Sequence, residues 1–227
     1  MAICVLDDSG VAVTLALPSC VRQSFAQHFL SHRTYALVTI EHPSPPRAPE
    51  VFQAAVETTA GRFVIIVHRQ WSPHGADRFF ELIAQHYYDN SRFFRVVADK
   101  WAQFGLAGDP AVAQAWRSRT MPDDQPIQSN LYGFVAFANT GADTRATQIF
   151  INLRDNSAQN DPEPGFAPFG EVTVGMSVVE QLYAGYCETS GGGMRAGGQD
   201  AMFAGGNAWL DARFPRLDRL IRITLHR

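Results

Sequence analysis

Hydrophobic residues recur at helical spacing in the stretch that follows Ser72-Pro73-His74-Gly75. The apolar positions fall at i, i+3, i+4, i+7, i+8 and i+11, at Ala76, Phe79, Phe80, Ile83, Ala84 and Tyr87. Charged and amide side chains occupy the opposite face, so the pattern predicts an amphipathic helix packed on a core. A second, shorter amphipathic helix is predicted over residues 176–183.

The other apolar runs are short and alternate with polar residues, which is typical of strands. Residues 52–57 and 62–68 flank Thr58-Thr59-Ala60-Gly61, and this arrangement predicts a β-hairpin. Further strands are predicted over residues 93–97, 101–104, 134–138, 148–153, 169–172 and 220–225. Many short strands with only two helices predict a mainly β domain. A closed or nearly closed antiparallel barrel is favoured because closure removes exposed strand edges.

Residues 1–50 differ from the rest of the chain and are interpreted as an N-terminal extension. Strands are predicted over residues 11–17 and 35–40, with a helical turn over 24–30. Residues 43–49 are rich in proline and predict an extended linker. A targeting presequence, a docking arm and an addition to the sheet all remain open as roles for the extension. The folded domain is predicted over residues 51–227, with irregular insertions at 109–132 and 185–207.

Composition limits the classes of protein that fit this chain. Hydrophobic residues make up 46% of the sequence and charged residues 18%, so a sizeable core is expected. The net charge of −3 argues against a protein that coats nucleic acid or a membrane surface. Three cysteines at unrelated spacings predict free thiols. No apolar run is long enough for a membrane span. A soluble protein is expected, with a cytoplasmic location slightly favoured over organellar import through residues 1–50.

Several common catalytic motifs are missing from the sequence. No dinucleotide-binding, phosphate-loop or nucleophile-elbow pattern occurs. His28 and His32 have metal-ligand spacing without a third ligand nearby, so neither a metal nor a cofactor is predicted. What remains is a set of polar residues within or at the ends of apolar strands. We expect these to line one groove on the barrel wall, with Phe150 as its apolar floor: Arg95, Gln103, Asn139 and Gln148.

Five sequence blocks in order resemble the cyclophilin-type peptidyl-prolyl cis-trans isomerase family. They are Phe93-Phe94-Arg95-Val96-Val97, Gln103-Phe104-Gly105, Phe137-Ala138-Asn139-Thr140-Gly141, Thr147-Gln148-Ile149-Phe150-Ile151 and Phe169-Gly170-Glu171-Val172. The resemblance runs from about residue 52 to residue 223, and the insertions are similar to those of a bacterial-like branch. It implies a closed eight-stranded antiparallel β-barrel capped by two α-helices.

The resemblance also implies roles for individual residues. Arg95 matches the catalytic arginine, and Phe150 matches the floor of the proline pocket. Phe166 falls where many members carry His or Tyr. The positions that hydrogen-bond the peptide are matched by Gln103, Ala138, Asn139 and Gln148.

Two departures from the family pattern concern the proline pocket. Lys100 stands where an aromatic residue is usual, and Trp101 replaces a smaller apolar residue. Residues 159–164, which include Asn160, offer no apolar side chain where members carry a tryptophan or leucine. Cyclosporin-type ligands of the family use the same walls, so weak inhibition is expected.

The function implied is isomerisation of Xaa-Pro bonds in peptides and proteins, which assists protein folding. The alternative is a cyclophilin-fold scaffold or proline-peptide-binding module of low activity, as a subunit of a larger complex. The expected partners are proline-containing peptides or proteins, without nucleic acid or membrane insertion. Residues 1–50 and the two insertions are the candidate contacts for an assembly partner.

Overall fold

The computed structural model describes residues 2–6, 12–16, 46–162, 165–190 and 199–226. Contacts divide the chain into two units, Met1–His42 and Pro43–Arg227. In the first unit, β1 (Ala2–Leu6) pairs antiparallel with β2 (Ala12–Ala16). β2 overlaps the strand predicted over residues 11–17. The strand predicted over 35–40 and the helical turn over 24–30 lie outside the described residues.

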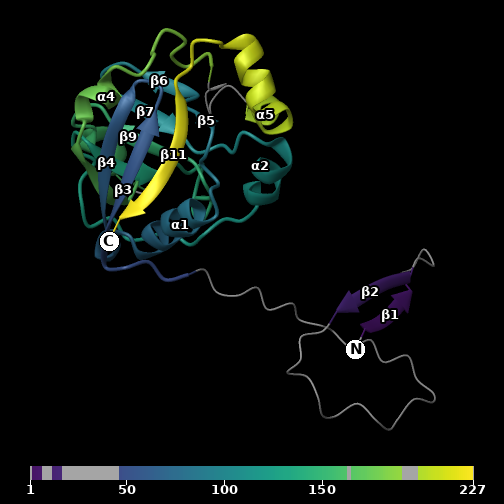
Figure 1. Cartoon of the computed structure of the whole chain (residues 1–227). Helices are drawn as coiled ribbons and strands as arrows, with labels where there is room; N and C mark the ends of the chain where they lie inside the picture. Colours follow the sequence, from purple (N-terminus) through teal and green to yellow (C-terminus); the bar gives the residue numbers. More distant parts are fainter. Residues whose placement is uncertain (1, 7–11, 17–45, 163–164, 191–198, 227) are drawn as a thin grey trace. The chain divides into compact units, whose positions relative to one another are not determined.

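A nine-stranded antiparallel sheet forms the second unit and curls around a core (Figure 1). In bonded order its strands are β5 (Ser91–Arg92), β11 (Arg219–His226), β3 (Val51–Thr58), β4 (Gly61–His68), β10 (Pro168–Val174), β8 (Phe134–Phe137), β9 (Ile149–Asn152), β7 (Trp101–Phe104) and β6 (Arg95–Val97). The mainly β fold is therefore confirmed.

The strand count differs from the eight expected because one strand is interrupted. The two outermost strands, β5 and β6, are consecutive in the chain and are separated only by Phe93 and Phe94. Both phenylalanines are fully buried, so their side chains turn into the core at the interruption. If β5 and β6 are counted as one broken strand, the sheet has eight strands. The chain itself then links the two edges of the curled sheet.

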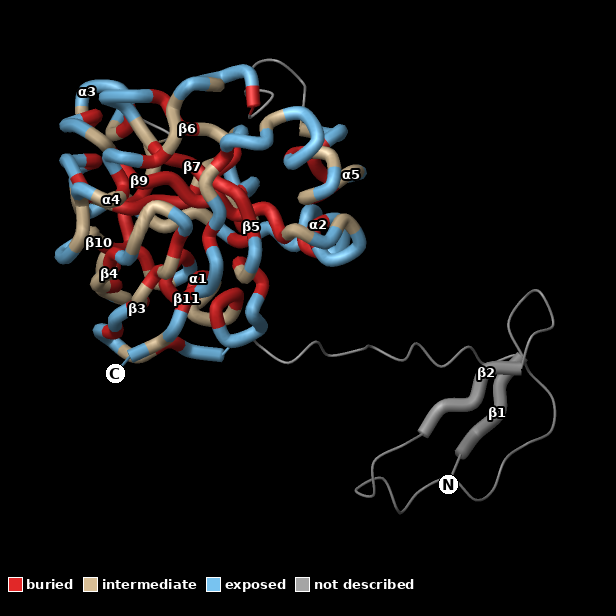
Figure 2. Tube along the Cα trace, turned by 45° about the horizontal axis from the view of Figure 1, so that its top comes forward, coloured by how far each residue is buried: buried red, intermediate tan, exposed pale blue. Residues whose placement is uncertain are grey.

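Aromatic side chains dominate the interior, which appears as the red segments of the tube in Figure 2. Phe79 of α1 (Pro73–Ala84) packs against Phe52 of β3 and against Tyr88 and Phe169, with ring centroids 5.1–6.5 Å apart. Complete burial of one such side chain contributes about 1.5–3 kcal/mol. The predicted amphipathic helix thus covers the barrel with its apolar face.

The helix count of two is wrong, although both predicted helices are present as α1 and α4 (Met176–Glu180). The insertions that were expected to be irregular contain α2 (Pro110–Arg117) and most of α5 (Gln199–Arg213). The domain also contains the short α3 (Ser157–Asn160) and the 3-10 turn η1 (Arg69–Trp71). Figures 1 and 2 show α2 and α5 side by side on one flank of the barrel.

Local chemistry explains why α2 forms and why α5 escaped detection. The Asp109 carboxylate accepts hydrogen bonds from the Ala111 and Val112 N–H groups, and Pro110 opens the first turn. α5 contains Gly205 and Gly206, and Gly206 breaks the helical conformation at φ 53° and ψ −144°. This break interrupts the regular apolar spacing, so periodicity gives no clear helix there.

The packed domain includes Ala48, which lies in the proline-rich segment. Ala48 is buried among core residues, and its N–H donates to Asp77 Oδ1 at 2.8 Å. Burial works to raise the pKa of Asp77, but hydrogen bonds from Arg69 and Ala48 outweigh it and lower the pKa. Because folding lowers this pKa, the ionised carboxylate stabilises the fold above its unfolded pKa. That contribution is lost as the pH falls through the folded value.

Two truncated chains test where the domain begins. A chain of residues 46–227 keeps the Ala48 contacts and should melt close to the full-length protein. A chain of residues 51–227 loses two hydrogen bonds, from the Ala48 N–H to Asp77 and from the Arg69 N–H to the Glu50 carbonyl. Each is worth about 1 kcal/mol, so this chain should melt about 4–8 °C lower. Thermal unfolding followed by circular dichroism measures both. An unfolded 46–227 chain would show that residues 1–45 belong to the domain.

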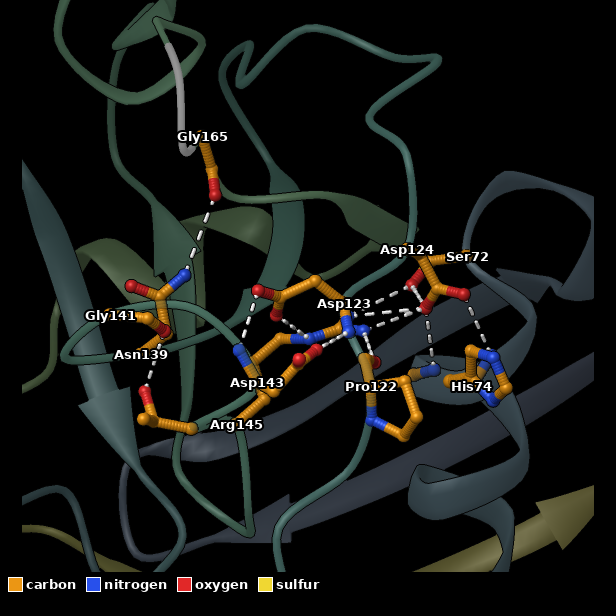
Figure 3. A network of polar contacts seen from close by, with 12 residues as sticks. Ser72, His74, Pro122, Asp123, Asp124, Asn139, Gly141, Asp143, Arg145 and Gly165 are labelled. Carbon is orange, nitrogen blue, oxygen red and sulfur yellow. Dashed lines mark hydrogen bonds and ion pairs between the residues drawn. The ribbon is translucent and has the colours of Figure 1, made fainter.

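Arg145 lies at the centre of a buried ionic network (Figure 3). Its Nε donates to Asp123 at 3.0 Å, and Nη1 and Nη2 each donate to Asp124 at 3.1 Å. Asp124 also accepts from Ser72 Oγ at 2.5 Å and from the His74 and Gly75 N–H groups at 3.1 and 3.0 Å. An insertion residue therefore caps the N-terminus of α1, and Arg145 neutralises the buried charge.

Arg145→Met should destabilise the protein by about 3–5 kcal/mol, because it leaves Asp124 buried without its cation. Arg222→Met is the matched control, since that arginine pairs with Glu57 and is 60% exposed. Urea unfolding of both variants gives the comparison. Equal stability of the two variants would contradict a structural role for the network.

Candidate active site

Strand register places three of the predicted site residues side by side. Arg95 of β6 pairs directly with Gln103 of β7, and Gln103 pairs with Phe150 of β9. Their neighbours on the same strands, such as Val96 and Ala102, belong to the core cluster, whereas these three do not. Because side chains alternate between the faces of a sheet, the three residues share the outer face of the barrel wall.

Hydrogen bonds join Arg95, Gln103 and Gln148 into what we call the polar row. Arg95 Nη1 donates to Gln103 Oε1 at 2.9 Å, and Gln103 Nε2 donates to Gln148 Oε1 at 2.9 Å. Gln103 is 1% exposed, so its amide is held from both sides without competition from water. The row thus presents one cation in a fixed position on an otherwise apolar wall.

Trp101 supports the same cation from one face. The Arg95 guanidinium lies 4.7 Å from the centroid of the Trp101 ring, within cation–π range. Lys100 is exposed at the rim, with Nζ 5.9 Å from that centroid. Within the described residues the buried Trp101 indole N–H has no hydrogen-bond partner. Trp101 therefore gives Arg95 a contact in addition to its hydrogen bond with Gln103.

Phe150 and Phe166 form an aromatic corner beside the row. Their rings meet edge to face, with centroids 5.3 Å apart and an interplanar angle of 88°. The Phe166 main chain is held at both ends, because its N–H donates to the Asn160 carbonyl and its carbonyl accepts from Asn130 Nδ2, both at 2.9 Å. The aromatic corner is thus a fixed apolar surface.

The side chains of Asn160 and Asp161 form hydrogen bonds that hold the loop that carries Phe166. Asn160 is 4% exposed, and its Nδ2 donates to Asn152 Oδ1 at 3.3 Å. Asp161 Oδ1 accepts from the main-chain N–H and the side-chain amide of Asn130, both at 2.9 Å. Asn156 joins this amide cluster through Asn152 at 2.8 Å. Only the abundance of asparagine in these loops hints at the cluster in the sequence.

A cavity of about 200 Å³ adjoins the row at the far side of Gln148. Ala138 and Asn139 line it, and the Ala138 N–H donates to the Gln148 carbonyl at 2.9 Å. Asn139 Nδ2 also reaches the Gly165 carbonyl at 3.4 Å (Figure 3). The structure thus brings all the predicted site residues to one region of the wall, with Lys100 at its rim.

The insertion helices supply residues that sequence reasoning missed. Arg117 of α2 and Gln199 and Phe203 of α5 border the cavity. Gln148 Nε2 donates to Gln199 Oε1 at 2.9 Å. At the other end of the row, Glu188 pairs with Arg95 through Nε at 2.6 Å and Nη2 at 2.8 Å. No pattern in the sequence marks these residues, because they lie in segments without clear periodicity.

Neither a metal centre nor a membrane-spanning helix is found in the described part of the chain. No group of three His, Cys, Asp or Glu residues there is arranged to hold a metal ion. None of the helices described is long and apolar enough to cross a bilayer. The site consists of a fixed guanidinium, a hydrogen-bonded amide row and an aromatic corner.

Comparison with known proteins identifies the family. The model of the cyclophilin type peptidyl-prolyl cis-trans isomerase family matches residues 53–196. This match covers more than half of the chain, and the chain belongs to that family.

Similar proteins occur in plants, animals and bacteria. The isomerase CYP18-2 of Arabidopsis thaliana is 29% identical over 142 residues, which cover 61% of this chain and 81% of the relative. The human peptidyl-prolyl cis-trans isomerase-like 1 is 25% identical and covers 64% of this chain, with 87% of the relative aligned. An isomerase of Acinetobacter baylyi is 27% identical, with 56% and 69% covered.

Solved structures confirm the fold. A cyclophilin type isomerase of Cryptosporidium parvum superposes with a TM-score of 0.57 at 16% identity, covering 78% of this chain and 98% of that one. A second structure of that protein, in the presence of the dipeptide Ala-Pro, gives a TM-score of 0.55, also at 16% identity, covering 77% of this chain and 99% of that one.

Proposed function

We propose that this chain catalyses cis-trans isomerisation of Xaa-Pro bonds in peptides and in exposed loops of proteins. The observation that carries the proposal is the fixed Arg95 guanidinium beside the Phe150–Phe166 corner. Rotation about an amide bond faces a barrier of about 18–20 kcal/mol, and uncatalysed exchange of Xaa-Pro takes tens to hundreds of seconds. A folding chain with a non-native isomer therefore benefits from catalysis.

Arg95 is assigned the catalytic role. In the twisted transition state the proline nitrogen loses conjugation and carries a localised lone pair. A guanidinium directed at this nitrogen stabilises the twisted form more than either planar isomer, which is the requirement for rate enhancement. Arginine suits the task because it stays charged and offers a planar set of donors. The reaction needs no nucleophile and no proton transfer.

The other residues hold the substrate while one side of the bond rotates. Phe150 and Phe166 would contact the proline ring, and Gln103 and Gln148 would fix the flanking peptide. The Ala138 N–H is used within the barrel, so the Asn139 main chain takes the peptide-binding role on that side. The cavity beside Gln148 would receive a neighbouring side chain of the peptide. The partners proposed are accordingly proline-containing peptides and proteins.

A binding module of low activity is the second candidate. The observation that favours it is the reciprocal amide pair between Gln148 and Gln199, which occupies groups that a peptide would use. A module of this kind would bind proline peptides without accelerating their isomerisation. Activity of the wild-type protein in the assay described next separates the two candidates.

Arg95→Ala should lower kcat/KM by well over tenfold, because the transition-state cation is removed. A protease-coupled assay on an Ala-Pro peptide measures the rate, and thermal unfolding checks that the variant folds. Arg222→Ala is the control, since it removes an exposed arginine from β11. Equal activity of Arg95→Ala and the wild type would remove Arg95 from the mechanism.

Cyclosporin should inhibit weakly or not at all. Asn160 and Asp161 are bound into the amide cluster, and Lys100 is exposed, so two apolar walls are missing. Each buried apolar side chain contributes about 1.5–3 kcal/mol, and about 1.4 kcal/mol is tenfold in affinity. Lys100 should also favour small or acidic residues before proline. Titration of the drug against activity is the measurement, and inhibition at nanomolar drug would contradict the assignment of the pocket walls.

A further inference from the structure

The Arg95 guanidinium pairs with Glu188, which belongs neither to the strands of the barrel nor to the site residues predicted from the sequence. Glu188 lies in the turns after α4 and approaches Arg95 edge-on, with both carboxylate oxygens engaged: Nε–Oε2 is 2.6 Å and Nη2–Oε1 is 2.8 Å. Such a two-point contact fixes the plane of a guanidinium as well as its position. Glu188 therefore restricts the group that is proposed to act in catalysis.

The main chain around Glu188 is tied to the strand that carries Arg95. Ser190 is 1% exposed, and its hydroxyl donates to the Phe94 carbonyl at 2.7 Å, one residue before Arg95. The turn itself is closed by hydrogen bonds from the Cys187 N–H to the Ala184 carbonyl at 3.0 Å and from the Thr189 N–H to the Tyr186 carbonyl at 2.9 Å. Hydrogen bonds of the residues before and after Glu188 thus hold its carboxylate beside β6.

The contacts of Arg95 leave a defined part of it for a substrate. A guanidinium has five N–H donors. Two of them donate to Glu188 and one to Gln103, so two donors are not used by these contacts. Trp101 covers one face of the group at 4.7 Å. Glu188 and Gln103 therefore occupy part of the guanidinium rim and Trp101 covers one face, which leaves two N–H donors on the terminal nitrogens and the opposite face outside these contacts.

We propose that Glu188 is a positioning residue for Arg95 in the isomerisation, an inference that rests on the proposed function. An arginine side chain loses rotamer freedom when it is directed at a substrate, and a partner that fixes it beforehand removes that loss from the reaction. The carboxylate also weakens the positive field of Arg95. The Glu188 side chain is 50% exposed, so water screens the negative charge and reduces this weakening of the field. The effect of Glu188 on the orientation of Arg95 therefore outweighs its effect on the field.

The test compares variants of the full-length chain in the coupled assay on an Ala-Pro peptide. Glu188→Ala should lower kcat/KM about fivefold, the upper range for loss of one partly exposed ion pair. Glu188→Gln should lose less, because its amide oxygen still accepts one hydrogen bond from Arg95. Glu57→Ala is the matched control and should keep full activity, since it removes a glutamate that pairs with Arg62 and Arg222 on other strands.

A double variant separates positioning from a general effect on the fold. If Glu188 acts through Arg95, adding Glu188→Ala to Arg95→Ala should cause no further loss of activity. Melting temperatures of the single variants should match that of the wild type. Wild-type or higher activity of Glu188→Ala, or an additive loss in the double variant, would overturn the inference. An inactive wild type would instead overturn the proposed function, whereas a fully active Arg95→Ala would remove Arg95 from the mechanism and the inference with it.

Discussion

Antiparallel pairing of β6, β7 and β9 fixes the arrangement on which the site depends. This pairing sets Arg95 opposite Gln103 and Gln103 opposite Phe150. A slip of one residue would turn the arginine into the core and expose Val96 or Ala102. Burial of those apolar residues therefore holds the register, and the register holds the cation, the amide and the aromatic floor in one line.

The polar row supplies the hydrogen bonds that buried amide groups on an apolar barrel wall require. Buried amides destabilise a protein unless they are hydrogen-bonded. Here Gln103 bonds to Arg95 and Gln148, and Gln148 bonds to Gln199. The segments after α4 complete this network at both ends, through Glu188 and Gln199. The added segments are thus part of how the barrel wall keeps its charged and amide groups in place.

Sequence patterns predicted those parts of the fold that depend on local spacing. The α1 face, the β3–β4 hairpin and the shared face of Arg95 in β6, Gln103 in β7 and Phe150 in β9 follow from periods of 3.6 and 2. Contacts between distant segments were not predictable in this way. Glu188 and Arg95 are 93 residues apart, and Asp124 caps a helix that starts 51 residues earlier at Pro73. α5 was missed because Gly206 interrupts its helical period.

The changes at Lys100 and Trp101 affect substrate binding and catalysis differently. An apolar pocket binds the proline ring in the planar and the twisted states alike, so its loss weakens substrate affinity more than the rate of the bound complex. In the mechanism proposed above, the guanidinium acts mainly on the twisted state. Trp101 stacks on Arg95, and Glu188 and Gln103 hold the guanidinium at its edge and end. In the proposed mechanism, this chain lacks apolar walls that would act on both states and keeps, with added support from Trp101 and Glu188, the guanidinium that would act on the transition state.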